Sequence, residues 1–142
     1  LNIEILLKRG DINSAYKAIT KSLKKYPNNR VFVYGLANYF IERKLATEAI
    51  KFLRSYVFVF RNDSTLYELL AKAYALKGMQ LLQHESLAES FYYKYNLQEA
   101  ISQMDMAVKA RDGNFYQKSR VEARLKKMQK EKEIYEISKA NL

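Results

Sequence analysis

The side chains that most often perform chemistry are scarce in this sequence. His84 is the only histidine, and the 142 residues include no cysteine. A zinc site needs three or four ligands, usually histidine or cysteine at short spacing, and this sequence cannot supply them. A Ser-His-Asp or Cys-His arrangement fails for want of the same partners. We therefore expect no metal and no cofactor in this chain, and we expect His84 on the surface or in a groove.

Glu85 and Glu89 are the carboxylates whose spacing comes nearest to that of a general acid and base. They lie one helical turn apart, a spacing that is common on wet helix faces. We favour such a face over acid–base catalysis. The sequence also has no glycine-rich loop of the phosphate-binding kind. It therefore predicts a chain that is not an enzyme.

The elements that position these side chains are predicted to be helices in a repeating array. Apolar residues recur at helical spacing, and the pattern around Leu66–Gly78 stands also 34 residues upstream, where Leu36 matches Leu70 and Lys44 takes the place of Gly78. A self-match at this period is the signature of a helical repeat array. One proline and four glycines also suit a mostly helical protein. We predict an all-α, right-handed solenoid of about eight antiparallel helices, closed by a C-terminal capping helix.

We expect one domain over residues 1–142, divided into units at 1–29, 30–63, 64–80, 81–113 and 114–142. The helices are predicted at about Leu1–Arg9, Ser14–Lys25 (capped by Asp11 or Asn13), Val31–Arg43, Thr47–Phe58, Leu66–Lys77, Gln80–Lys94, around Ala100–Ala107, and Phe115–Ser138. After Gly78 the period breaks, because the next match to Ala71 is Ala88, only 17 residues on. The third unit has thus lost its second helix. We expect the helix over Gln80–Lys94 to serve as partner of the preceding helix and as first helix of the last unit.

These residues resemble the tetratricopeptide repeat. The small residues at the helix contacts are Ala37, Ala49, Ala71, Ala88, Ala100 and Ala107, and Pro27 closes the first unit. The sequence departs from that motif where Lys44 and Tyr95 replace glycine.

A narrower resemblance covers almost the whole chain. The segments Tyr26–Asn29, Asn62–Ala75, Leu97–Ile101 and Asn114–Leu125 are similar to the C-terminal repeat domain of bacterial periplasmic M48 metalloproteases of the β-barrel assembly-enhancing type. In that family a separate N-terminal domain holds zinc through His-Glu-x-x-His, a motif that is not in this sequence. The resemblance implies a periplasmic, non-catalytic repeat domain whose partners are its own protease domain and the outer-membrane assembly machinery. Because the chain has no initiating methionine and opens inside a repeat, we expect a fragment of such a protein.

Twelve tyrosines suggest where proteins or peptides bind. Tyrosine supplies broad contact area with a polar tip at little entropic cost. Tyr67 and Tyr74 lie on packing positions and are expected in the core. The first helices of each unit line the concave face of such an array, and by repeat register that lining includes Tyr34, Asn38, Ile41, Glu42, Glu68, Lys72, Glu85, Glu89, Tyr92 and Tyr93. Binding of a polypeptide there and cover by the missing domain remain alternatives.

The run Tyr56–Phe60 is apolar where a helix end is usually polar. Five successive apolar residues cannot all face one stripe, so some are exposed or covered by something else. We expect Phe58 and Phe60 to form a docking patch for a protease domain, a membrane or a second copy of the chain.

The net charge of +10 favours an acidic partner in principle. The excess is split between residues 1–60 (11 basic, 4 acidic) and 107–142 (10 basic, 5 acidic), and lysine and glutamate alternate over Lys126–Glu136. We therefore do not expect nucleic acid as a partner. The sequence contains no run of 18 apolar residues, so it predicts no membrane-spanning helix. The predicted function is protein binding that positions a protease in outer-membrane protein quality control, and the alternative is a self-associating or intramolecular scaffold without a binding groove.

Overall fold

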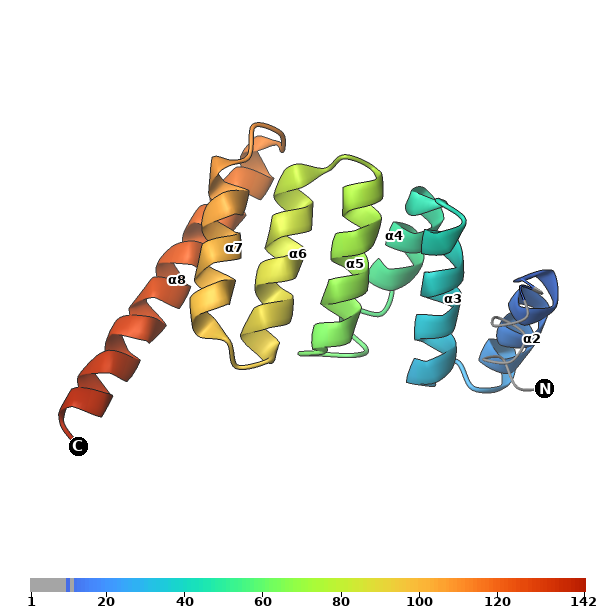
Figure 1. Ribbon diagram of the computed structural model, residues 1–142, viewed down its shortest axis with the longest axis horizontal. Coiled ribbons are helices and arrows are strands. Elements are labelled where there is room, and N and C mark those ends of the chain that lie inside the picture. The colour runs from blue at the N-terminus through green and yellow to red at the C-terminus, as the bar shows by residue number, and fades with distance from the viewer. Residues whose placement is uncertain (1–9, 11) are drawn as a thin grey trace.

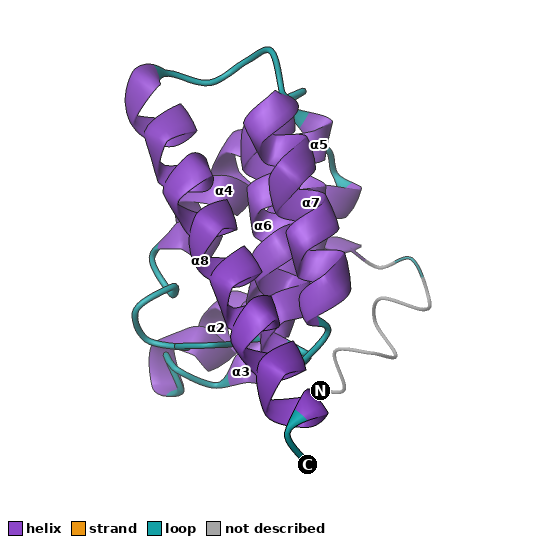
Figure 2. Ribbon diagram, turned by 90° about the vertical axis from the view of Figure 1, so that its left-hand side faces the viewer, coloured by secondary structure: helices purple, strands orange, loops and turns teal. Residues whose placement is uncertain are grey.

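The computed structural model describes residue 10 and residues 12–142, and within them it contains seven helices and no strand (Figures 1 and 2). The helices are α2 (Ile12–Lys25), α3 (Arg30–Glu42), α4 (Ala46–Arg54), α5 (Ser64–Leu76), α6 (Gln80–Tyr93), α7 (Leu97–Lys109) and α8 (Phe115–Ala140). The all-α solenoid expected from the sequence is confirmed. The expected helix over Leu1–Arg9 and the cap at Asp11 lie outside the described residues. Asn13, the alternative cap, lies inside the first turn of α2.

The repeat register is visible in the backbone at the turns between helices. Lys44, Gly78 and Tyr95 all have left-handed backbones, with φ of 59°, 72° and 62°. A left-handed residue ends a helix by turning its last N–H groups back to the carbonyls of the final turn. Lys44 and Tyr95 therefore replace glycine in sequence and keep its conformation.

Buried alanines allow the helices to approach closely. Ala15, Ala37, Ala49, Ala71, Ala88, Ala100 and Ala107 are all at most 3% exposed. Larger side chains fill the spaces beside them, among them Leu53, Leu66 and Met104, which are fully buried. One core cluster lies among α3, α4 and α5 and a second among α6, α7 and α8, and Leu82 packs against both.

Side-chain caps begin α5 and α8, whereas the end of α4 differs from the prediction. The Asp63 carboxylate accepts hydrogen bonds from the backbone of Thr65 and Leu66, and Asn114 and Gln117 form a reciprocal capping box. The predicted helix over Thr47–Phe58 instead ends at Arg54. The chain then turns because Tyr56 and Phe60 stack, with ring centroids 5.2 Å apart, and because the Tyr56 hydroxyl donates to the Pro27 carbonyl at 2.7 Å.

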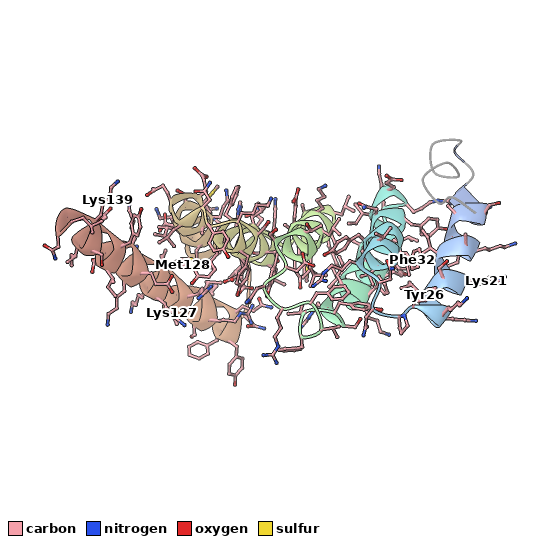
Figure 3. The ribbon with its side chains drawn as sticks, turned by 90° about the horizontal axis from the view of Figure 1, so that it is seen from below. Lys21, Tyr26, Phe32, Lys127, Met128 and Lys139 are labelled. Carbon is pink, nitrogen blue, oxygen red and sulfur yellow. The ribbon has the colours of Figure 1, made fainter. Side chains whose placement is uncertain are left out.

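The order of the helices is regular up to α5 and changes there. Helices α5, α6 and α7 lie side by side, and α6 packs extensively against both neighbours. Figure 3 shows α4 and α8 on one side of this row, with Met128 of α8 turned towards the body and Lys139 at its far end. The C-terminal half of α8 extends beyond the other helices (Figure 1). None of the described helices combines the length and the hydropathy of a membrane-spanning segment.

Candidate functional site

An open hollow lies between α4 and α8 and has α5 and α6 as its floor. It consists of two adjoining recesses of about 540 and 460 Å³ that share Arg54, Tyr74, Leu82 and Gln117. We call the two together the central hollow. One wall is α4 with the turn after it, and the other is the N-terminal half of α8, as Figure 3 allows the reader to follow.

The central hollow lies where the sequence predicts a shortened third unit. In a regular array each unit adds a second helix behind its first, so a helix belonging to α5 would lie next to α4. Here α6 follows α5 directly and packs against α7 as well, and in the described part of the chain α6 makes no packing contact with α4. The space beside α4 is therefore left without a helix of this chain.

The floor of the central hollow is aromatic. Tyr67 of α5 and Tyr93 of α6 stack with ring centroids 5.7 Å apart, and Tyr74 lies about two turns further along α5 and is 6% exposed. Burial, with the nearby Tyr93 and Glu89, raises the pKa of Tyr67 to about 12. Burial also raises the pKa values of Tyr74 and Tyr93. The three hydroxyls thus stay neutral and can donate hydrogen bonds beside apolar ring surface.

Two ion pairs fix the α8 wall to the floor. The Arg120 guanidinium donates to both oxygens of Glu85 at 2.6 and 2.7 Å, and Arg124 donates to both oxygens of Glu89 at 2.6 and 3.1 Å. Bidentate pairing of this kind fixes orientation as well as distance. The hydrogen bond from Arg120 to Glu85 raises the pKa of Arg120. Burial lowers the pKa of Arg124, but its hydrogen bond and attraction to Glu89 outweigh burial, so that pKa is raised overall.

The opposite end of the central hollow holds cations without a carboxylate partner. Lys51 and Arg54 of α4 and Lys77 after α5 line this end, and no ion pair to any of them occurs within the described residues. Among the residues that the structure describes, the Lys77 ammonium donates only to the Thr47 hydroxyl, at 2.9 Å. Since Glu85 and Glu89 are already neutralised by Arg120 and Arg124, the hollow is net positive.

The predicted docking patch of Phe58 and Phe60 is half wrong. Phe60 is 3% exposed and belongs to the core, where its ring packs against Tyr34 and Tyr56 and under the Arg30 guanidinium. It cannot form a docking surface. Phe58 is 80% exposed and lies on the wall of the central hollow, so its docking role stays a prediction.

The residues predicted for the concave face are divided between two faces. Glu85, Glu89 and Tyr93 line the central hollow. Tyr92 lies beside it, with its ring under Arg124 at 4.5 Å and its hydroxyl donating to Glu131 at 2.8 Å.

The other predicted residues do not line the central hollow. Tyr34 and Ile41 pack against the first core cluster, and the Tyr34 hydroxyl donates to Asp63. Asn38 and Lys72, 34 residues apart, are exposed at equivalent positions, as is Glu42. Glu68 forms an ion pair with Lys94 at 3.3 Å. Because Tyr67 and Tyr74 face the hollow, Glu68 and Lys72 are turned about 100° or more away from it.

Sequence reasoning missed several residues that line the central hollow. Tyr67 and Tyr74 were assigned to the core alone, and Arg54, Arg120 and Arg124 were not singled out. A signal existed, because Arg120 and Arg124 repeat the four-residue spacing of Glu85 and Glu89. When two arginines and two glutamates have the same spacing on facing helices, they can form two parallel ion pairs.

A third recess adjoins the central hollow at Tyr93 and lies between the C-terminal half of α8 and the turn from α6 to α7. Its volume is about 1130 Å³, and Tyr95, Leu97, Tyr135 and Lys139 are among the residues that line it. Tyr95 is 97% and Tyr135 is 64% exposed.

His84 is half-buried between α6 and α7, where its Nδ1 lies 2.9 Å from Oε1 of Gln103. Within the described residues no three His, Cys, Asp or Glu side chains are grouped so that they could hold a metal ion.

Two comparisons with known proteins agree with this geometry. Residues 6–73 match the family model of the tetratricopeptide repeat. The chain is 27% identical over 118 residues, 82% of its length, to the Beta-barrel assembly-enhancing protease of Yersinia pestis. It spans only about a quarter of that relative, 24% of its length.

Proposed function

Because this chain is a tetratricopeptide-repeat domain that resembles the repeat region of a Beta-barrel assembly-enhancing protease, we propose that it binds other proteins in its central hollow. Tetratricopeptide repeats generally serve protein–protein interaction. The observation that carries the proposal is the hollow itself. It is concave and open, and its floor joins aromatic surface to hydroxyl donors.

The rigidity of the central hollow supports a role in binding. The two bidentate pairs between α6 and α8 hold the second wall against the floor before any partner arrives. A site that is ordered in advance loses less entropy when a partner binds. Phe58 on the facing wall offers an exposed aromatic anchor of the kind that often dominates interface energies.

The role in the whole protein follows from the name of the relative. We infer that the chain is the non-catalytic repeat domain of an M48-type zinc metalloprotease. It would position that protease against polypeptides during quality control of outer-membrane protein assembly, in the periplasm. The zinc belongs to the protease domain and not to these residues.

The test replaces one exposed aromatic residue that lines the hollow and one that does not. Phe58 is 80% and Phe115 is 76% exposed, so Phe58→Ala and Phe115→Ala remove equally accessible rings at little cost to folding. Affinity capture with the wild-type chain and both variants measures the retained partners. We expect Phe58→Ala to lose them and Phe115→Ala to keep them.

If both variants retain the partners equally well, the binding site does not lie in the central hollow. If the wild-type chain retains only itself, and sedimentation shows an oligomer that Phe58→Ala dissociates, the hollow serves self-association instead.

A further inference from the structure

We propose that the segment received by the central hollow is an amphipathic α-helix with acidic flanks, contributed by a partner protein. This inference rests on the proposed function and adds the chemistry of the partner. It follows from the shape of the hollow, from what its walls can offer a backbone, and from its charge.

The shape is that of a vacant helix position. The hollow lies between α4 and the first half of α8, where the second helix of the third unit is missing. Its floor is an antiparallel pair of 13 and 14 residues, which corresponds to a length of about 20 Å. Side chains of two such helices form ridges into which a third helix can pack.

The walls favour a helix over an extended peptide. One common way to bind an extended peptide is to add it to the edge of a sheet, which supplies backbone hydrogen bonds. The described residues contain no strand, and the backbone groups of α4, α5, α6 and α8 are engaged within their own helices. A buried extended peptide would therefore depend on side chains of the hollow for all its backbone hydrogen bonds. A helix satisfies its own backbone and needs only side-chain contacts.

The charge of the hollow selects acidic flanks. Lys51, Arg54 and Lys77 gather at one end without a carboxylate partner in the described part of the chain. The two acids of the floor are already paired. Basic flanks would be repelled by like charges, whereas acidic flanks would supply the missing partners. The apolar side of such a helix would meet Tyr67, Tyr74 and Leu82.

The probes are three synthetic peptides of about 14 residues, matched to the length of the floor. The first has leucine at helical spacing with glutamate on the flanks. The second has the same leucines with lysine flanks. The third is the acidic peptide with proline and glycine at its centre, which prevents a helix. Fluorescence anisotropy gives their affinities for the wild-type chain, and circular dichroism follows helix formation on binding.

We expect the acidic peptide to bind and become helical, and the other two to bind at least about tenfold more weakly. The double variant Lys51→Glu with Arg54→Glu should lose the acidic peptide and gain the basic one. Its control is Arg111→Glu with Lys126→Glu, which makes the same change in charge at two exposed residues outside the hollow. Circular dichroism of each variant checks that it is folded.

The basic peptide binding as tightly as the acidic one would overturn the proposed charge, and tight binding of the proline peptide would overturn the proposed helix. Absence of binding by the acidic peptide would overturn the inference as a whole. In each case the proposed function is judged separately, by whether Phe58→Ala loses captured partners.

Discussion

The tyrosines on the floor of the central hollow show that a side chain at a core position can also line a binding site. Tyr67 and Tyr74 were expected in the core, and Tyr74 is indeed 6% exposed. Both nevertheless line the hollow. A residue can thus satisfy a core pattern in sequence and still line a site.

This environment predicts a loss of stability at high pH. Tyr67 has a pKa of about 12 in the fold against 10.0 as a reference, because burial disfavours the charged form. Its contribution to stability is complete below pH 10 and is lost as the pH rises towards 12. Urea unfolding at rising pH should show the free energy of unfolding falling over this range.

The variant Tyr67→Phe should make that decline shallower, and Tyr116→Phe, at a 79% exposed ring, should leave it unchanged. An identical slope in all three proteins would refute the assigned burial effect.

Phe58 and Phe60 show that residue type alone does not predict which side chain is buried. Both stand in one apolar run, and nothing in their types separates them. The stack of Phe60 on Tyr56 turns it into the core and leaves Phe58 outside. That outcome depends on the contacts that Tyr56 makes in the turn after α4, with Phe60 and with the carbonyl of Pro27.

At the scale of the elements, helix positions followed from periodicity, proline and capping residues. Gln80 and Phe115 were predicted as helix starts and are helix starts. The end of α4 could not be predicted in the same way. The interaction that ends it joins Tyr56 to the carbonyl of Pro27, 29 residues earlier, and local pattern contains no information about such a contact.

The left-handed residue between α3 and α4 gives a prediction about an element boundary. Lys44 holds φ at 59°, a conformation that costs a residue with a side chain roughly 1–2 kcal/mol. Lys44→Gly should therefore raise the free energy of unfolding by about 0.5–1 kcal/mol, after allowance for the greater freedom of glycine in the unfolded chain. Urea denaturation measures the change.

The matched control is Lys72→Gly, an exposed position inside α5, which should lower the free energy of unfolding by about 1 kcal/mol. A loss of stability in both variants would mean that the turn at Lys44 is not strained.

For the whole molecule, the repeat period could be recognised in the sequence and a shortened third unit predicted from it, but the hollow could not be predicted. Assigning residues to the concave face by register assumed that every unit presents the same face. Because α6 belongs to two helix pairs, its Glu85 and Glu89 line the central hollow together with Tyr67. Glu68 and Lys72 do not line it. The register argument fails at the point where the array is irregular, and that is where the hollow forms.

The two halves of α8 should differ in their importance for the fold. Val121, Leu125 and Met128 are buried in the second core cluster, and their burial is worth roughly 5–8 kcal/mol in total, comparable with the stability of a small domain. Residues 133–142 are all exposed. Deletion of residues 115–142 should abolish cooperative unfolding, and deletion of residues 133–142 should change it little. Thermal melts followed by circular dichroism compare the two, and equal loss in both would contradict the assigned role of the core half.

The most direct test of the central claim is photocrosslinking from both faces of the array. A photoreactive amino acid replaces either Phe58, on the wall of the central hollow, or Lys72, exposed on the face turned away from it. We predict crosslinks to a partner protein from position 58 and none from position 72. Crosslinks from position 72 with none from position 58 would contradict binding in the hollow.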